Sequence, residues 1–186
     1  MLVKVLTYLL LLCSIAIAQT VSVIEETDKS VTVEVDFTGV FQIKDSIAEG
    51  INYKRIVGGA YYTEQEGLPS VPYTLVTLGV PAGAKPKVEN LSIAEEQISN
   101  TLLLKQPIVN AKFASESQRV FSSSERFPKE KVLSGAVIRF RDLNYLNVTV
   151  YPYQWNPLTR TLSFTPKIRF RINFNNSILS GVTTSD

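Results

Sequence analysis

Strict alternation of apolar and polar residues is the feature that most limits how this chain can fold. From Val31 to Phe37, and again from Ile168 to Phe174, every second residue is apolar and the residues between are polar. Leu146, Val148 and Val150 form a third such set. Successive side chains of a strand point to opposite faces, so this pattern predicts antiparallel sheets that are each covered on one face. Two such sheets packed together form an all-β antiparallel sandwich. The side chains expected to point inward are Val31, Val33, Val35, Phe37, Ile168, Phe170, Ile172 and Phe174.

Other segments carry weaker signals. Five further strands are predicted at Val21 to Glu25, Asn52 to Val57, Tyr73 to Val80, Lys87 to Ile93 and Ala136 to Phe140. The stretch from Ile93 to Leu104 is ambiguous, because its charged centre is also compatible with a short helical turn. Lys105 to Lys131 alternates poorly and is dense in Ser, which predicts a long irregular segment. Such segments are uncommon in compact domains and often functional, although a plain surface loop is an equally good interpretation.

The first eighteen residues are typical of a secretory signal peptide. Lys4 supplies a positive start, an apolar run follows, and Ala16-Ile17-Ala18 offers small residues at the positions that a signal peptidase reads. The run is too short for a lasting membrane anchor. We therefore expect cleavage between Ala18 and Gln19, export to the periplasm or beyond, and one mature domain at residues 19–186.

The residue types missing from the chain exclude the common nucleophilic catalytic sites and the usual zinc sites. The chain has no His, and its single Cys, Cys13, lies in the signal peptide. Cys–His and Ser–His–Asp sites are therefore excluded, as are the usual zinc sites, and we expect no cofactor and no metal. The adjacent carboxylates Glu25-Glu26 and Glu95-Glu96 are interpreted as solvated charge. A formal charge of +2 gives no support for nucleic-acid binding.

The stretch YPYQWNPLTRTLSF leaves two interpretations open. Tyr151, Tyr153 and Trp155 are two residues apart, so a strand would place the three rings on one face. They form either the flank of a hairpin turned into the core or a platform that stacks on a sugar. Asn156-Pro157 favours a turn, and Pro152 favours a strand end. The hairpin would run from Leu146 to Gln154 and back from Arg160 to Thr165.

Two parts of the chain carry a family resemblance. The segment GLPSVP, from Gly67 to Pro72, closes on Val80-Pro81-Ala82-Gly83 and resembles a pattern of gingipain-type propeptides. The tail resembles them too, in the order Phe127-Pro128, Gly135, Tyr151 to Pro157, Leu162 and Ile168 to Phe174. The resemblance implies a β-sandwich that keeps a secreted, caspase-like cysteine peptidase latent and assists its folding. It implies a peptidase partner in cis or in trans, and often secretion by the type IX system.

The sequence departs from such a zymogen because it contains neither the catalytic His nor the catalytic Cys of a peptidase domain. We therefore expect a fragment or a stand-alone pro-domain that is not itself an enzyme. The alternative is a secreted β-sandwich module that binds carbohydrate or a cell surface.

The resemblance also implies an inhibitory loop that enters the peptidase cleft with a basic residue. The loop expected here is Lys105 to Lys131, and its candidates are Arg126, then Arg119, with Lys129 also retained. Arg126 ranks first because Pro128 restricts Phe127 to extended conformations, which suit a cleft. Plain solvated charge is the competing interpretation of these residues.

Overall fold

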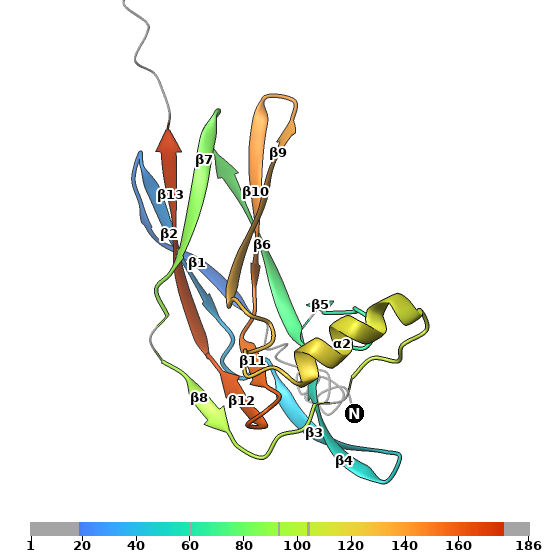
Figure 1. Ribbon diagram of the computed structural model, residues 1–186. Helices are drawn as coiled ribbons and strands as arrows, with labels where there is room; N and C mark the ends of the chain where they lie inside the picture. The colour runs from blue at the N-terminus through green and yellow to red at the C-terminus, as the bar shows by residue number, and fades with distance from the viewer. Residues whose placement is uncertain (1–18, 60, 93, 104, 177–186) are drawn as a thin grey trace, which may run out of the picture.

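The computed structural model describes residues 19–176 apart from residues 60, 93 and 104 (Figure 1). The expected signal peptide therefore lies outside the described residues, and of its cleavage pair only Gln19 is described. The strands are β1 (Thr20–Glu26), β2 (Ser30–Asp36), β3 (Gln42–Ala48), β4 (Ile51–Val57), β5 (Tyr61–Tyr62), β6 (Pro72–Val80), β7 (Ala84–Asn90), β8 (Glu96–Ile98), β9 (Val132–Phe140), β10 (Leu143–Val150), β11 (Tyr153–Asn156), β12 (Thr161–Phe164) and β13 (Lys167–Asn176). The helical elements are the 3₁₀ turn η1 (Ala111–Phe113) and the helix α2 (Ala114–Phe121).

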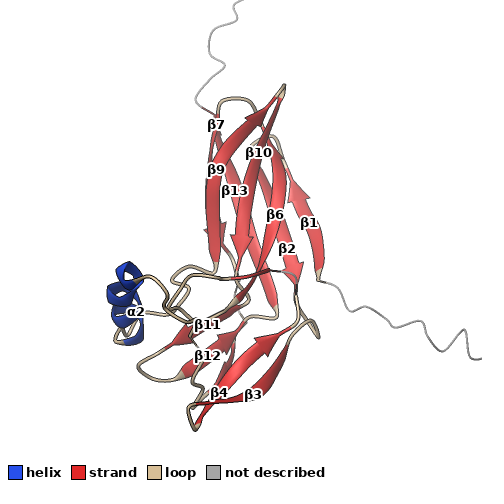
Figure 2. Cartoon of the chain, turned by 90° about the vertical axis from the view of Figure 1, so that its right-hand side faces the viewer, coloured by secondary structure: helices blue, strands red, loops and turns tan. Residues whose placement is uncertain are grey.

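Two four-stranded antiparallel sheets form the upper part of the described chain (Figures 1 and 2). One sheet has the order β1-β2-β13-β7 and the other β5-β6-β10-β9. The alternating segments pair in the first sheet, where Val33 lies opposite Phe170 and Val35 opposite Ile168. This register puts both apolar rows on one face, so the prediction of an all-β sandwich is confirmed.

The core lies between these two sheets. Of the eight side chains expected to point inward, seven are buried, and Phe174 is partly buried against the same cluster. Leu146, Val148 and Val150 of β10 complete the cluster from the opposite sheet, each with no exposed area. Burying side chains of this size contributes about 1.5–3 kcal/mol each, which makes this cluster the main source of stability in the sandwich.

A second hydrophobic cluster, the lower cluster, lies below the sandwich, where β12 pairs with β11 on one side and with β8 on the other, and where β3 pairs with β4 (Figure 2). Trp155 has no exposed area and its indole N–H donates to the carbonyl of Thr101 at 2.8 Å. Tyr153 is also buried and stacks on Phe164, with ring centroids 4.7 Å apart. The core interpretation is confirmed for Tyr153 and Trp155, whereas Tyr151 is only partly buried against the same cluster. A platform of three rings is wrong, because the buried rings of Tyr153 and Trp155 offer no face to a ligand.

Three local predictions differ from the structure. The ambiguous stretch contains the strand β8 rather than a helical turn, since Glu96 to Ile98 pair with β12. The hairpin is split: β10 ends at Val150, and β11 pairs with β12, as expected of a strand end at Pro152. The segment from Lys105 to Lys131 is not wholly irregular, because it contains η1 and α2. Ile93 and Leu104 lie outside the described residues.

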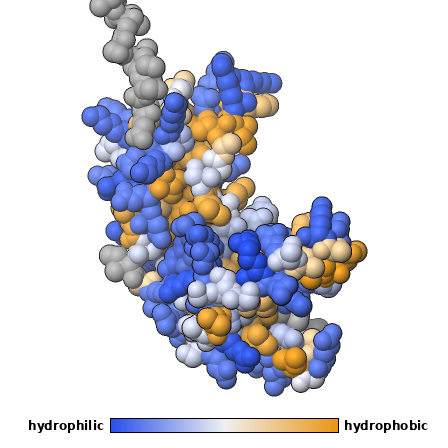
Figure 3. Space-filling view, viewed as in Figure 1, coloured by the Kyte–Doolittle hydropathy of each residue, from blue (hydrophilic) through white to orange (hydrophobic). Residues whose placement is uncertain are grey.

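The strand β9 is the edge of its sheet and is exposed along almost its whole length. Figure 3 shows apolar surface on the upper half of the molecule, over the strands of the sandwich. The exposed apolar side chains of the β9–β10 hairpin are Leu133, Val137, Ile138, Phe140 and Leu143. The chain thus leaves an apolar strand edge uncovered on the part that the structure describes.

Candidate functional site

The helix α2 is held beside the sandwich by the turn that the GLPSVP segment forms. The hydroxyl of Ser117, the buried residue of the helix, donates to the carbonyl of Gly67 at 2.6 Å. The side-chain amide of Gln65 donates to the carboxylate of Glu116 at 2.6 Å. Gly67 has a φ of +77°, and an added Cβ would lie 2.8 Å from the Cβ of Ser117. The turn therefore needs glycine for its backbone and for the close approach of the helix.

The chain before α2 is tied to the same turn. One carboxylate oxygen of Glu66 accepts the backbone N–H groups of Val109 and Asn110, at 3.0 and 2.7 Å. The side chain of Asn110 then caps η1 by accepting from the N–H of Lys112 at 3.1 Å. A side chain on the turn thus fixes where the helical segment begins.

The chain after α2 is fastened to β11. Phe127 and Trp155 exchange two backbone hydrogen bonds of 2.7 Å each. The amide of Gln154, which is buried, donates to the carbonyls of Pro128 and Lys129 at 2.9 and 3.0 Å. The segment is therefore anchored at Phe127, in extended pairing with a core strand. Its charged side chains project from a fixed backbone.

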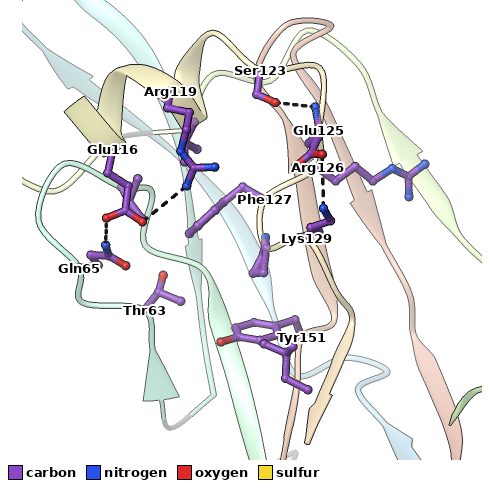
Figure 4. Close-up of a pocket in the computed structure, with 14 residues that line it drawn as sticks. Thr63, Gln65, Glu116, Arg119, Ser123, Glu125, Arg126, Phe127, Lys129 and Tyr151 are labelled. Atoms are coloured by element: carbon purple, nitrogen blue, oxygen red, sulfur yellow. Dashed lines mark hydrogen bonds and ion pairs between the residues drawn. The ribbon is translucent and has the colours of Figure 1, made fainter. Parts of the chain in front are cut away.

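A pocket of about 330 Å³ lies between α2, this anchored segment and Tyr151 (Figure 4). Its wall is partly apolar, from Leu68, Phe127 and Leu133. The three basic residues that the sequence singled out, Arg119, Arg126 and Lys129, all line it. The fold thus gathers the candidates, which span eleven positions of chain, at one place.

The three basic side chains differ in how they are held. The side chain of Arg119 is 74% exposed, and its guanidinium lies 3.9 Å from the carboxylate of Glu116. Lys129 is 69% exposed and lies 3.4 Å from Glu125. Figure 4 shows that the guanidinium of Arg126 points away from the pocket interior, whereas that of Arg119 lies on the side of Glu116 and Gln65. Exposed pairs of this kind are weak, so Arg119 and Lys129 are available to a partner.

Arg126 is turned aside by Glu95. Its Nη1 lies 2.6 Å from a Glu95 oxygen, and the Nζ of Lys131 lies 3.0 Å from the same oxygen. Burial raises the pKa of Glu95, but the hydrogen bonds from Arg126 and Lys131 outweigh it and leave that pKa below its usual value. The interpretation of Glu95 as solvated charge is therefore wrong. Glu96, its neighbour, is exposed.

Two features of the site escaped the sequence reasoning. The helix α2 had a local signal, because Phe113, Ser117, Val120 and Phe121 follow the spacing of one helix face. The bond between Glu95 and Arg126 had no signal in the sequence, because the two residues are far apart in the chain and no pattern links them.

The described residues hold no group of three or more Asp, Glu, His or Cys side chains placed to bind a metal ion. In the same residues, no helix combines the length and the apolar character that crossing a bilayer requires. The pocket offers apolar contacts and charged side chains of both signs, since Glu116 and Glu125 line it together with the three basic residues.

Comparison with known proteins decides the family. A family model of the Propeptide_C25 propeptides matches residues 17–184, nearly the whole sequence. The chain belongs to the Propeptide_C25 family. It is therefore a propeptide of the gingipain type, as the GLPSVP segment and the tail indicated, and this kind of domain carries no catalytic activity of its own. A search of curated proteins found no match.

Two solved structures are similar in fold to this propeptide. The complex of the pro- and mature domains of RgpB from Porphyromonas gingivalis matches with a TM-score of 0.72 and 18% identity. The match covers 88% of this chain and 89% of that one. A structure described as giving insight into the zymogenic latency of gingipain K, from the same organism, matches with a TM-score of 0.64 and 18% identity. That match covers 88% of this chain and 96% of the other.

Proposed function

We propose that this domain keeps a gingipain-type cysteine peptidase latent and assists its folding. It does so without catalysis, by placing a basic side chain from the segment 119–129 in the substrate cleft of the peptidase. The peptidase is present either in the same chain or as a separate one. The observation that carries the proposal is the convergence of Arg119, Arg126 and Lys129 on one pocket beside an exposed helix.

The geometry supports an inhibitor that is anchored rather than flexible. Phe127 and Pro128 are fastened to β11 by backbone and side-chain hydrogen bonds, so the neighbouring basic residues are presented at a defined position. A loop ordered before binding loses less conformational entropy when it enters a cleft. One of the similar solved structures is a complex of pro- and mature domains and the other concerns zymogenic latency, which supports this role.

The three candidates have different parts in the proposal. A guanidinium pairs bidentately with a carboxylate at the floor of a pocket, whereas an ammonium interacts with that carboxylate as a point charge. Arg126 stays the first choice for a cleft because it directly precedes the anchored Phe127. Arg119 is the most exposed of the three and is the second choice. Lys129 would serve a peptidase that selects lysine.

The test is a titration of a peptidase with basic specificity, using the isolated domain from Gln19 onward. We expect inhibition by the wild type, and a loss of about 2 kcal/mol of binding free energy when the anchoring residue is replaced by Ala. The variants are Arg126→Ala, Arg119→Ala and Lys129→Ala. Lys112→Ala is the matched control, since Lys112 lies in the same stretch from Lys105 to Lys131 but outside the pocket. Inhibition that all three variants retain would contradict the basic-anchor mechanism.

We further propose that the domain is exported by an N-terminal signal peptide that ends at Ala18, leaving a mature domain at residues 19–186, and that its peptidase travels by type IX secretion. Gln19 suits a new N-terminus, because its side-chain oxygen already accepts the hydroxyl of Thr74 at 2.6 Å, just before β1. Mass spectrometry of the exported protein should give Gln19 as the first residue. An N-terminus inside β1 would contradict this cleavage site.

A further inference from the structure

The strongest unexplained feature of the molecule is one carboxylate shared by two cations. A single oxygen of Glu95 lies 2.6 Å from the guanidinium of Arg126 and 3.0 Å from the ammonium of Lys131. The side chains of Glu95 and Lys131 are only 19% and 15% exposed, whereas that of Arg126 is 40% exposed. The three groups thus form an inner pair and an outer arginine.

Glu95 and Lys131, the inner pair, neutralise each other's charge without Arg126. A buried carboxylate that loses its only partner is left uncompensated, which is costly. Here Lys131 remains on Glu95 when Arg126 departs, so departure breaks a partly exposed contact and leaves no buried charge unpaired. Arg126 is the member that the arrangement allows to move.

We propose that Glu95 is a positioning residue that withholds Arg126 from the peptidase cleft, and that Lys131 keeps Glu95 neutralised when Arg126 is released. The inference rests on the proposed function, because it takes Arg126 as the residue that enters the cleft. The direction of the Arg126 side chain carries it: the guanidinium is drawn to Glu95 and away from the pocket lined by Arg119 and Lys129 (Figure 4).

The physical consequence is competition for one guanidinium. A carboxylate in a peptidase cleft binds Arg126 only after Glu95 has released it, so part of the binding free energy is used to break the internal bond. Glu95 therefore lowers the affinity of the domain for its peptidase. This makes the inhibitor easier to displace during activation than its anchored backbone alone would allow.

Two substitutions test this competition, because one should strengthen inhibition of the peptidase and the other should weaken it. In Glu95→Gln the carboxylate is gone, while the Gln oxygen still accepts from Lys131, so inhibition should tighten by about three- to tenfold. In Lys131→Gln, Arg126 becomes the sole cation on Glu95, so inhibition should weaken by a similar factor. Glu96→Gln is the matched control, since it removes the same charge one residue further along, from an exposed side chain without an ion pair among the described residues. Both effects should vanish in an Arg126→Ala background.

A measurement without any peptidase separates this inference from the proposed function. Phenylglyoxal modifies accessible arginines, and its rate at Arg126 can be followed by peptide mass spectrometry with Arg119 as the internal reference. We expect Glu95→Gln to raise the rate at Arg126 several-fold and leave Arg119 unchanged. An unchanged rate at Arg126, or weaker inhibition by Glu95→Gln, would overturn the withholding role of Glu95.

The two proposals fail in different ways. Faster modification of Arg126 together with unchanged inhibition supports its restraint by Glu95 but overturns the placement of Arg126 in the cleft. Inhibition that survives Arg126→Ala and responds to Arg119→Ala overturns the same placement. Thermal unfolding of each variant controls for the fold, and a variant that unfolds early is replaced by the pair Glu95→Gln, Lys131→Met, which removes both inner charges together.

Discussion

At the scale of single residues, burial decides what each aromatic side chain does. Trp155 and Tyr153 belong to the lower hydrophobic cluster, while Tyr61 on β5 is 52% exposed. All three are aromatic residues on strands, so residue type and local spacing do not separate them. Their contributions to the free energy of unfolding should differ accordingly.

Replacing Trp155 by Ala should be strongly destabilising. The side chain has no exposed area, and its N–H serves the buried Thr101 carbonyl. The change removes packing and leaves that carbonyl unpaired, so we expect a loss of about 3–5 kcal/mol in the free energy of unfolding, measured with urea. Tyr61→Ala is the control and should stay within about 0.5 kcal/mol. A Trp155→Ala domain of near wild-type stability would contradict the assigned position of this ring.

Tyr153 should make stability depend on alkaline pH. Burial, with a smaller contribution from Glu96, raises the pKa of its hydroxyl to about 12. The unfolded chain ionises near pH 10, so the contribution of this group is complete below pH 10 and is lost as the pH rises towards 12. A shift of about two units corresponds to roughly 3 kcal/mol of stability.

The measurement is urea unfolding of the wild type and of Tyr153→Phe between pH 9 and pH 12. The variant lacks the hydroxyl, so its stability should fall less steeply over this range than that of the wild type. Parallel curves for the two proteins would show that Tyr153 is not responsible.

At the scale of elements, the position of α2 depends on a single glycine. Gly67 lies opposite Ser117 and Ile108, and its φ is +77°. An added methyl group would meet the side chains of both residues at less than 3 Å. The helix is short, and its contact with the GLPSVP turn holds it in place.

Gly67→Ala should therefore destabilise the domain by more than an ordinary turn substitution. Gly83→Ala is a matched control, because Gly83 has a similar φ of +72° but nothing within 4 Å of the added Cβ. We expect Gly67→Ala to cost about 1–3 kcal/mol beyond the control, and to increase hydrogen exchange in residues 114–121. Equal costs for the two substitutions would mean that the helix does not pack as closely as described.

At the scale of the whole molecule, the two hydrophobic clusters are joined by shared side chains. Phe41 and Phe164 pack against both the sandwich cluster and the lower cluster. Phe41 also meets Tyr153 edge to face, with ring centroids 5.5 Å apart. The basic residues of the candidate site are anchored on the lower cluster through Phe127 and Trp155. Their position therefore depends on how the two clusters are coupled.

The wild type should unfold in one step, and Phe164→Ala should uncouple its two parts. Trp155 fluorescence reports the lower cluster, and far-UV circular dichroism reports mainly the strands of the sandwich. We expect the two signals to share one urea midpoint in the wild type. In Phe164→Ala the fluorescence midpoint should come at lower urea, because the lower cluster is the smaller. Coincident midpoints in the variant would contradict this coupling by Phe164.

The sequence by itself determined the sandwich. The alternating rows of β2 and β13 specify a strand, its inner face and its register, because side-chain direction in a strand is a local property with a period of two. The Asn156-Pro157 turn was readable for the same reason, since its side chain and ring act on their own backbone. The GLPSVP segment and the tail indicated the family to which the chain belongs.

Only the tertiary structure decided the contacts between distant segments. The strand β8 exists because β12 supplies its hydrogen-bond partners, and α2 lies where Gly67 accepts the hydroxyl of Ser117. The bond between Glu95 and Arg126 joins residues whose neighbours in sequence reveal nothing of each other. Such pairs form only when both segments pack against a common core. A periodic sequence pattern reports the local direction of side chains, but it does not report which distant segments come together. The apolar rows of β2 and β13 can therefore be predicted from the sequence, whereas the restraint on Arg126 exists only in the folded molecule.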